Sequence, residues 1–113
     1  MHEMSIAINI IDIATREAVK AKAKKVNSID IEIGSLSGVV VEALDFALQI
    51  AVKDSILESA EVNIMEICGR AKCNQCSKEF ELKDLYEICP LCGSPDITIL
   101  QGQEMRVKTM NIQ

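Results

Sequence analysis

Aromatic residues are nearly missing from this chain. Among its 113 residues there are no Trp, one Tyr and two Phe. A hydrophobic core must therefore be built from aliphatic side chains, and the 49% of hydrophobic residues supply enough of them. Since a chain of this length buries about two-thirds of its unfolded surface, we expect one domain, or a small domain that carries a smaller module.

Basic residues and long apolar runs are also scarce. Lys and Arg number 12 against 17 Asp and Glu, which gives a net charge of −5. Nucleic-acid-binding domains usually present a basic face, and this composition does not favour one. No apolar run reaches the roughly 18 residues that span a bilayer, and the beginning lacks the features of a secretion signal. We therefore expect a cytoplasmic protein that acts without nucleic acid or a membrane.

Histidine occurs once, at position 2. One His so close to the start cannot complete a Ser/His/acid or Cys/His arrangement for nucleophilic catalysis. We therefore expect no enzymatic activity. The enzymatic alternative is a thiol oxidoreductase, which requires that the cysteines hold no metal.

Hydrophobic periodicity predicts two helices and several strands. The first helix is expected over Glu3–Lys25, with an ion pair between Asp12 and Arg16 on its polar side. The other expected elements are a strand around Ile29–Ile33, a helix around Val40–Lys53, a long strand over Ala60–Arg70 with a bulge near Met65, and strands around Ile97–Ile99 and Met105–Val107.

The order strand, helix, strand implies a crossover with parallel strands, and both helices would cover one face of the sheet. The last strand must return to that sheet, because its apolar face has no other place to pack. We therefore predict an α/β fold in which two helices lie on a small three-stranded mixed sheet with an inserted four-cysteine zinc-ribbon module. The α/β domain would comprise residues 1–69 and 96–113, and the module residues 70–95.

Four of the five cysteines form two CxxC pairs separated by twelve residues, Cys73 with Cys76 and Cys89 with Cys92. Twin CxxC turns can deliver four sulfurs to one tetrahedral zinc ion. Four sulfurs fill the coordination sphere, so this zinc would be structural and would supply much of the module's folding energy.

Two other interpretations of the cysteines remain open: redox-active CxxC motifs, and a nucleic-acid-binding zinc ribbon. The second requires basic and aromatic residues around the cysteines. From Gly69 to Ile97, however, there are only four basic residues against five acidic ones. The fifth cysteine, Cys68, is expected to be a small buried residue on a strand rather than an extra ligand.

A second set of candidate ligands lies at the beginning of the chain. The Met1 amine, the His2 amide and the His2 imidazole can close adjacent chelate rings around one metal, and Glu3 can add a fourth ligand. A planar set of this kind suits Ni(II) or Cu(II) better than zinc. A histidine near a terminus is, however, more often a solvated side chain that binds nothing.

Several stretches together resemble one known family along nearly the whole chain. They are Met1-His2-Glu3-Met4-Ser5, the stretch from Ile33 to Phe46 with its Gly-Ser-Leu-Ser-Gly run, the two CxxC pairs, and the closing strand from Glu104 to Val107. By these motifs the chain is similar to the HypA/HybF family of nickel-insertion proteins for [NiFe]-hydrogenase maturation.

The resemblance implies a nickel metallochaperone with transported Ni(II) and structural Zn(II). It implies nickel ligands from Met1, His2 and Glu3, and zinc ligands from the four paired cysteines. It also implies as partners the [NiFe]-hydrogenase large subunit and a nucleotide-hydrolysing maturation protein, either a HypB-type GTPase or an ATPase counterpart. Some members also serve urease.

The chain departs from the family pattern in two places. Val41 stands where a Pro is frequent, and Cys68 is not part of the pattern. Neither position is a predicted metal ligand, so the ligand assignment stands. We expect a monomer or a weak homo-oligomer.

Overall fold

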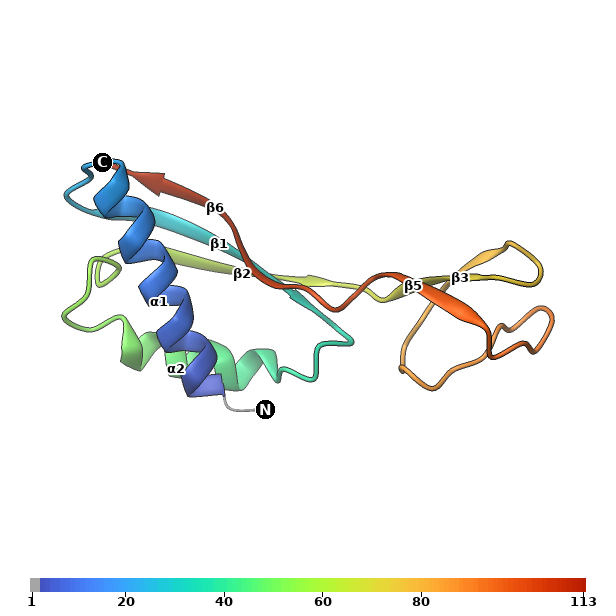
Figure 1. Cartoon of the computed structure of the whole chain (residues 1–113). Helices are drawn as coiled ribbons and strands as arrows, with labels where there is room; N and C mark the ends of the chain where they lie inside the picture. Colours follow the sequence, from blue (N-terminus) through green and yellow to red (C-terminus); the bar gives the residue numbers. More distant parts are fainter. Residues whose placement is uncertain (1–2) are drawn as a thin grey trace.

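The computed structural model describes residues 3–113, so Met1 and His2 lie outside the described residues. The molecule is elongated, with dimensions of 54 × 25 × 17 Å. Figure 1 shows two parts joined by a narrow waist: a larger part that contains both helices, and a smaller one formed by two loops and short strands. Neither helix has the length and apolar character that a membrane span requires.

The larger part, called the α/β domain below, is built on a three-stranded mixed sheet. Its helices are α1 (Glu3–Lys20) and α2 (Val41–Ala51), and its strands are β1 (Val26–Gly34), β2 (Glu61–Ile67) and β6 (Met105–Ile112). The strand order is β2-β1-β6, with β1 parallel to β2 and antiparallel to β6. Both helices lie on one side of the sheet (Figure 1). The predicted fold class is therefore confirmed.

The helix α1 forms because small and aliphatic residues recur on one face, where Ala7, Ile10, Ala14 and Ala18 are buried. The predicted pair of Asp12 and Arg16 is present, at 2.8 Å. The expected end at Lys25 is wrong, because the helix ends at Lys20.

The early end of α1 has a local cause. Lys22 adopts a left-handed conformation, with φ of 56°. The Lys22 N–H donates to the Val19 carbonyl at 3.1 Å, and the Ala23 N–H donates to the Ala18 carbonyl at 2.9 Å. These two hydrogen bonds form a Schellman motif, which satisfies the last free carbonyls of a helix and turns the chain away.

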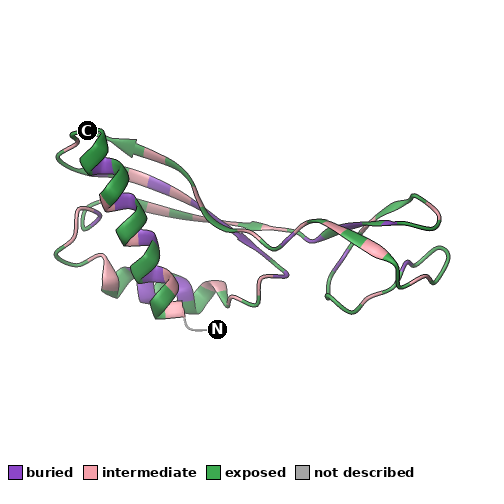
Figure 2. Ribbon diagram, in the orientation of Figure 1, coloured by how far each residue is buried: buried purple, intermediate pink, exposed green. Residues whose placement is uncertain are grey.

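The core of the α/β domain lies between the helices and the inner face of β1. There Ile29, Ile31 and Ile33 are at most 1% exposed, opposite Leu44 and Leu48 of α2 in the same cluster. The alternation that predicted this strand therefore corresponds to real burial of one face. Figure 2 shows that the buried residues concentrate along α1 and β1.

The outer face of the same sheet is polar. The carboxylate of Asp30 accepts hydrogen bonds from Thr109 Oγ1 at 2.6 Å and from Asn63 Nδ2 at 3.1 Å. These two bonds, that from Thr109 first, lower the pKa of Asp30. The next outward residue of β1, Glu32, accepts from Arg106 Nε at 2.7 Å. Cross-strand side-chain bonds therefore tie all three strands together on this face.

The smaller part, called the cysteine module below, has a sheet of its own. Its strands are β3 (Arg70–Cys73), β4 (Glu79–Glu81) and β5 (Ile97–Gln101), in the order β4-β3-β5, and both pairings are antiparallel. The hydrophobic cluster of this part has only three buried residues, Leu36, Ala71 and Leu82.

The predicted long strand Ala60–Arg70 is in fact divided between the two sheets. The β2 strand ends at Ile67, and β3 starts at Arg70. The bulge expected near Met65 is absent, because β2 pairs with β1 in an unbroken register. An irregularity occurs on the other neighbour of β1, where Lys108 is the extra residue between two paired positions of β6.

The prediction for Cys68 is also wrong. This residue lies between β2 and β3 and is exposed rather than buried on a strand. Its carbonyl accepts a hydrogen bond from Gln101 Nε2 at 2.8 Å. The chain crosses from one sheet to the other here, so the side chain faces neither core.

The waist between the two parts is packed through glycines. A Cβ on Gly34 would collide with the backbone of Gly102, and a Cβ on Gly102 would lie 2.6 Å from the Cα of Gly69. The Leu36 N–H donates to the Gly102 carbonyl at 2.7 Å, and the Leu36 side chain enters the module's hydrophobic cluster. The α/β domain thus supplies part of the core of the module.

The pairing of β5 bears on the proposed domain division. Since Ile97–Gln101 pairs with β3, these residues lie in the module's sheet rather than in the α/β sheet. The division into 1–69 with 96–113 and 70–95 stays a proposal. The strand pairing favours a later second boundary, at the turn that contains Gly102.

Candidate metal centre

The four paired cysteines come together at one point of the module. Cys73 is the last residue of β3, Cys76 follows in the next turn, and Cys89 and Cys92 lie in a second turn. Their sulfur atoms all lie within 4.8 Å of one another. The prediction that these four residues form one group is therefore confirmed for the described part of the chain.

The distances between these sulfurs suit a tetrahedral ion. The sulfurs of Cys73 and Cys92 are 3.4 Å apart, and those of Cys76 and Cys89 are 3.7 Å apart. A tetrahedron with metal–sulfur bonds of about 2.3 Å separates its sulfurs by about 3.8 Å, so the four residues fit zinc without large movement. Fitting four sulfurs around one ion leaves no position for water or a substrate.

The two CxxC turns repeat the same backbone pattern. In the first, the Cys73 N–H donates to the Lys78 carbonyl at 2.9 Å; in the second, the Cys89 N–H donates to the Ser94 carbonyl at 3.0 Å. The residue four positions after the first cysteine has a positive φ in both turns, 63° at Ser77 and 75° at Gly93. The sequence therefore builds two copies of one metal-binding turn that face each other.

Backbone N–H groups stabilise negative charge on the first sulfur of each turn. The Cys92 backbone N–H is the main cause that lowers the pKa of Cys89 to about 6, and the Cys76 N–H, 3.5 Å from the Cys73 sulfur, likewise lowers the pKa of Cys73. A hydrogen bond to a thiolate favours its ionised form.

Not all four sulfurs can ionise together in the absence of a cation. The Ser94 backbone N–H lowers the pKa of Cys92, but the neighbouring Cys73 sulfur and burial outweigh this effect and raise it to about 12. Adjacent thiolates repel each other, and a divalent ion at their centre removes this conflict. The cluster is therefore built for a cation.

A small polar network fixes the first turn against β5. Asn74 donates through Nδ2 to Asp96 Oδ1 at 2.9 Å, and its Oδ1 accepts from Thr98 Oγ1 at 3.1 Å. The Asn74 N–H also donates to the Asp96 carbonyl at 3.0 Å. The sequence pattern did not predict these supporting residues, although Asn and Asp beside a turn are the residue types that make such bonds.

Of the three residues predicted to bind nickel, Met1 and His2 lie outside the described residues. Glu3 is the first residue of α1, and its Oε2 accepts a hydrogen bond from the Val40 N–H at 3.3 Å. Val40 is the N-cap of α2 and has no side-chain cap of its own. The Glu3 carboxylate thus links the starts of the two helices, a contact that sequence reasoning did not predict.

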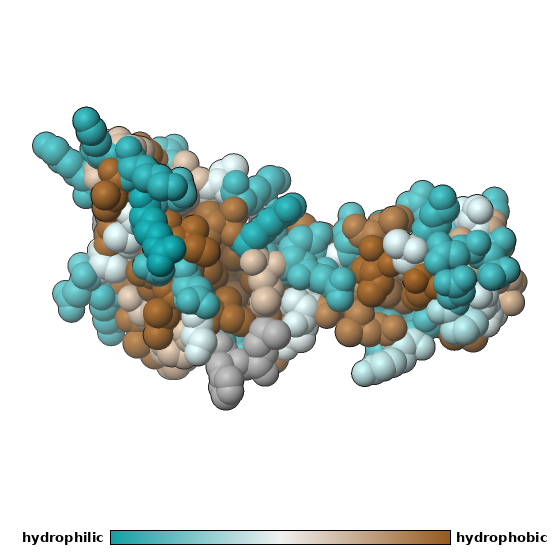
Figure 3. All heavy atoms as spheres, in the orientation of Figure 1, coloured by the Kyte–Doolittle hydropathy of each residue, from teal (hydrophilic) through white to brown (hydrophobic). Residues whose placement is uncertain are grey.

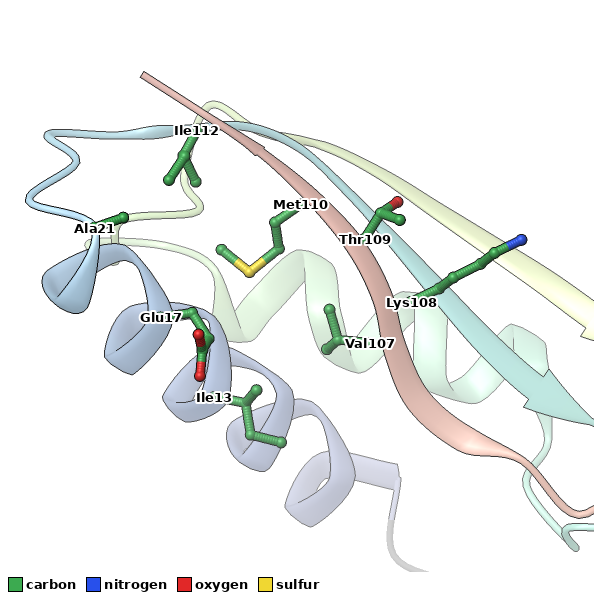
Figure 4. A pocket seen from close by; sticks show the side chains of 8 residues that line it. All are labelled: Ile13, Glu17, Ala21, Val107, Lys108, Thr109, Met110 and Ile112. Carbon is green, nitrogen blue, oxygen red and sulfur yellow. The ribbon is translucent and has the colours of Figure 1, made fainter.

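A surface groove of about 430 Å³ lies between α1 and β6. It is lined by the apolar residues Ile13, Val107 and Met110 and by two charged residues, Glu17 and Lys108. In Figure 4 the Lys108 side chain points away from the groove. Glu17 forms an ion pair with Lys20 of the same helix, at 3.7 Å.

Comparison with known proteins gives consistent matches along the chain. Residues 1–112 match the model of the family described as "Hydrogenase/urease nickel incorporation, metallochaperone, hypA". A hydrogenase maturation factor HypA from Francisella philomiragia is 44% identical over 110 residues, which cover 97% of each chain. One from Parabacteroides distasonis is 41% identical over 113 residues, which cover 100% of this chain and 98% of that protein.

A solved structure has the same fold. The solution structure of the Ni metallochaperone HypA from Helicobacter pylori superposes with a TM-score of 0.71 at 26% identity, and the match covers 99% of this chain and 97% of that one.

Proposed function

Since this chain belongs to the HypA family of hydrogenase/urease nickel-incorporation metallochaperones, we propose that it binds Ni(II) at its amino terminus and delivers it during [NiFe]-hydrogenase maturation. As a metallochaperone it is not an enzyme. The observation that carries the proposal is the family match from residue 1 to residue 112, which includes the run Met1-His2-Glu3.

The proposed nickel ligands are the Met1 amine, the His2 amide and imidazole, and Glu3. These groups are neighbours in the chain, so they can form a planar set of the kind that Ni(II) accepts. The position of Glu3 supports this proposal: it starts α1, and its carboxylate is already held near the start of α2. Ni(II) here is cargo, and a site made from the end of the chain can open without disturbing a core.

The zinc that we propose for the four cysteines has a different task. It is bound by Cys73, Cys76, Cys89 and Cys92, and it holds the two turns together. The closed set of four sulfurs supports a structural role, because an ion that must be handed on needs an open or easily opened coordination position. Zinc is therefore the resident metal in this proposal, and nickel the transported one.

The proposed partners are the [NiFe]-hydrogenase large subunit, as recipient, and a nucleotide-hydrolysing maturation protein of the HypB GTPase type or an ATPase counterpart. The family description also names urease. We place the activity in the cytoplasm, where thiols stay reduced and can bind metal. Transfer of nickel to purified hydrogenase and urease apoproteins in parallel would distinguish one recipient from two.

The test of the nickel site is substitution of its imidazole. His2→Ala should weaken Ni(II) binding at least about tenfold, since imidazole is a strong ligand for this ion, and should leave the zinc content unchanged. Met4→Leu is the matched control, because Met4 is close in sequence and exposed but contributes no proposed ligand. Nickel titration followed by absorption spectroscopy measures both. Equal affinity of His2→Ala and the wild type would refute the site.

A further inference from the structure

The start of α2 lacks the capping groups that a helix normally supplies for itself. Its N-cap is Val40, which makes no side-chain cap hydrogen bond, and Val is among the poorer residues at this position. In a capping box, a Glu or Gln three residues after the N-cap accepts a hydrogen bond from the N-cap N–H, but Ala43 stands there. The first turn of α2 therefore depends on a group from elsewhere in the chain.

Glu3 supplies that group from another helix. Its Oε2 accepts the hydrogen bond from the Val40 N–H at 3.3 Å, which is the bond that the missing Glu or Gln would make. Glu3 is the first residue of α1, so one carboxylate joins the starts of the two helices. A carboxylate is favoured at this place, because the N-terminal end of a helix carries a partial positive charge.

The chain around this contact contains no basic residue. None occurs in residues 3–15 or 26–52, which include the first turns of α1 and the whole of α2. On these segments the start of α2 is therefore the electropositive group that can hold the Glu3 carboxylate. Figure 3 shows hydrophobic surface over much of the α/β domain, and the exposed apolar residues of that domain include Met4 and Val40 themselves.

We propose that this bond positions the nickel-binding end of the chain, with the Val40 N–H as the positioning group and the Glu3 carboxylate as its anchor rather than as a nickel ligand. This inference rests on the proposed function and deepens it. Glu3 directly follows His2, so fixing its side chain to α2 restricts where the ligands at the beginning of the chain can lie. A restrained site loses less conformational entropy when it closes on an ion. The contribution of Glu3 to the ligand set then comes from its backbone.

The first test separates positioning from ligation at Glu3. Glu3→Gln keeps an oxygen that can accept from the Val40 N–H, but its neutral amide is a weaker nickel ligand than a carboxylate. Glu3→Ala removes the acceptor. We expect Glu3→Ala to weaken Ni(II) binding about fivefold, the effect of losing one exposed hydrogen bond, and Glu3→Gln to restore most of the affinity. Equal losses in the two variants, or no loss in Glu3→Ala, would overturn the proposal.

The second test removes the donor and leaves every proposed ligand in place. Proline has no N–H, and the Val40 φ of −84° is near the value that proline fixes. Val40→Pro should therefore weaken nickel binding about as much as Glu3→Ala. Val41→Pro is the matched control, because proline is favoured at the first helical position and the extended conformation of Val40 suits a residue before proline. It should bind nickel as the wild type does, and the same result for Val40→Pro would overturn the proposal.

The contact itself is measured in the zinc-loaded protein without nickel, labelled with ¹⁵N. The Val40 amide signal should move in Glu3→Ala and stay near its wild-type position in Glu3→Gln, while hydrogen exchange of α2 verifies that the helix is retained. An unmoved Val40 signal in Glu3→Ala would contradict the bond. If Val40→Pro loses α2, the two Glu3 variants and this signal decide the question.

His2→Ala distinguishes this inference from the proposed function. If His2→Ala binds nickel as the wild type does, the terminal site is wrong and the positioning role is lost with it. If His2→Ala loses affinity and Glu3→Ala does not, the terminal site stands and only the positioning role is refuted.

Discussion

The α/β domain and the cysteine module are stabilised in different ways. The cluster in the α/β domain contains twelve buried residues, whereas that of the module contains three, and one of these, Leu36, comes from the α/β domain. Figure 2 shows the same contrast as a concentration of buried residues around the helices. Hydrophobic burial is extensive in the first part and small in the second, for which we propose a structural metal.

Under the proposed function, this difference lets one small chain handle two metals. A metal that holds a fold together cannot be released without unfolding, so it suits the module. A metal that is cargo must leave without that cost, so its site belongs at the edge of a part that is stable by itself. The following predictions test this comparison, from the largest expected effect to the smallest.

Loss of a zinc ligand should unfold the module selectively. Cys73→Ser removes a ligand from a site whose binding free energy is on the order of 10 kcal/mol, so zinc should be lost and residues 70–101 should exchange their amide hydrogens rapidly. The strands β1, β2 and β6 should keep their protection, and nickel affinity should fall secondarily. Hydrogen exchange and zinc analysis measure these effects.

The control for this experiment is Cys68→Ser, since this exposed thiol is outside the four-cysteine group. It should retain zinc and normal protection. If Cys73→Ser also kept the module protected, the module would have enough hydrophobic stability of its own, and the contrast between the two parts would be false.

A methyl group at the waist should disturb the coupling of the two parts. Gly34→Ala places a Cβ against the Gly102 backbone, which cannot move without disrupting the packing between the two parts. Overpacking of this kind lowers the free energy of unfolding by about 3 kcal/mol. Gly38→Ala is the control, because a Cβ there has no neighbour within 4 Å and only the positive φ of 81° is strained, at about 1 kcal/mol. Urea unfolding gives both values. Equal losses would show that the waist is not tightly packed.

The two CxxC turns should respond in opposite directions to matched substitutions. Ser77 has a left-handed backbone conformation that strains a non-glycine residue. Ser77→Gly removes this strain and should stabilise the zinc-loaded module by about 1 kcal/mol. Gly93→Ala creates the same strain at the equivalent position, without a clash, and should destabilise it by a similar amount. Thermal unfolding and competition with a chelator measure the difference. Changes of the same sign would contradict the equivalence of the turns.

The smallest effect is expected from the polar face of the α/β sheet. The pKa of Asp30 is lowered by its bonds to Thr109 and Asn63, so its contribution to stability is present above the unfolded value of about 3.9 and is lost as pH falls through the folded pKa. Asp30→Asn should therefore be less stable than the wild type at neutral pH, and the two should converge in acid. Urea unfolding as a function of pH shows this. A constant difference would mean that the charge plays no part.

Sequence patterns predicted the elements that have one buried face. The alternating isoleucines of β1 are buried, and so are the small residues along one face of α1. Their spacing in the sequence therefore marks the buried face of each element. The four-cysteine group was equally predictable, because its spacing reflects the geometry of a turn. In these places local pattern and tertiary structure agree.

The places where prediction failed depend on contacts between distant segments. The segment from Ala60 to Arg70 gives no local sign that it is shared between two sheets, and the exposure of Cys68 follows from that crossing. The end of α1 is an exception with a local cause, because it required Lys22 to take a left-handed backbone conformation that Lys rarely adopts. The bond from Val40 to Glu3 joins residues 37 positions apart, so no local pattern contains it.

The central claim is that nickel is held by the beginning of the chain and zinc by the cysteine module. Adding Gly-Ser before Met1 moves the terminal amine away from His2 while all four cysteines stay intact. Counting both metals by native mass spectrometry should then show zinc retained and nickel lost. If the extended protein still takes up nickel with unchanged affinity, the terminal chelate is wrong and the cargo site lies elsewhere.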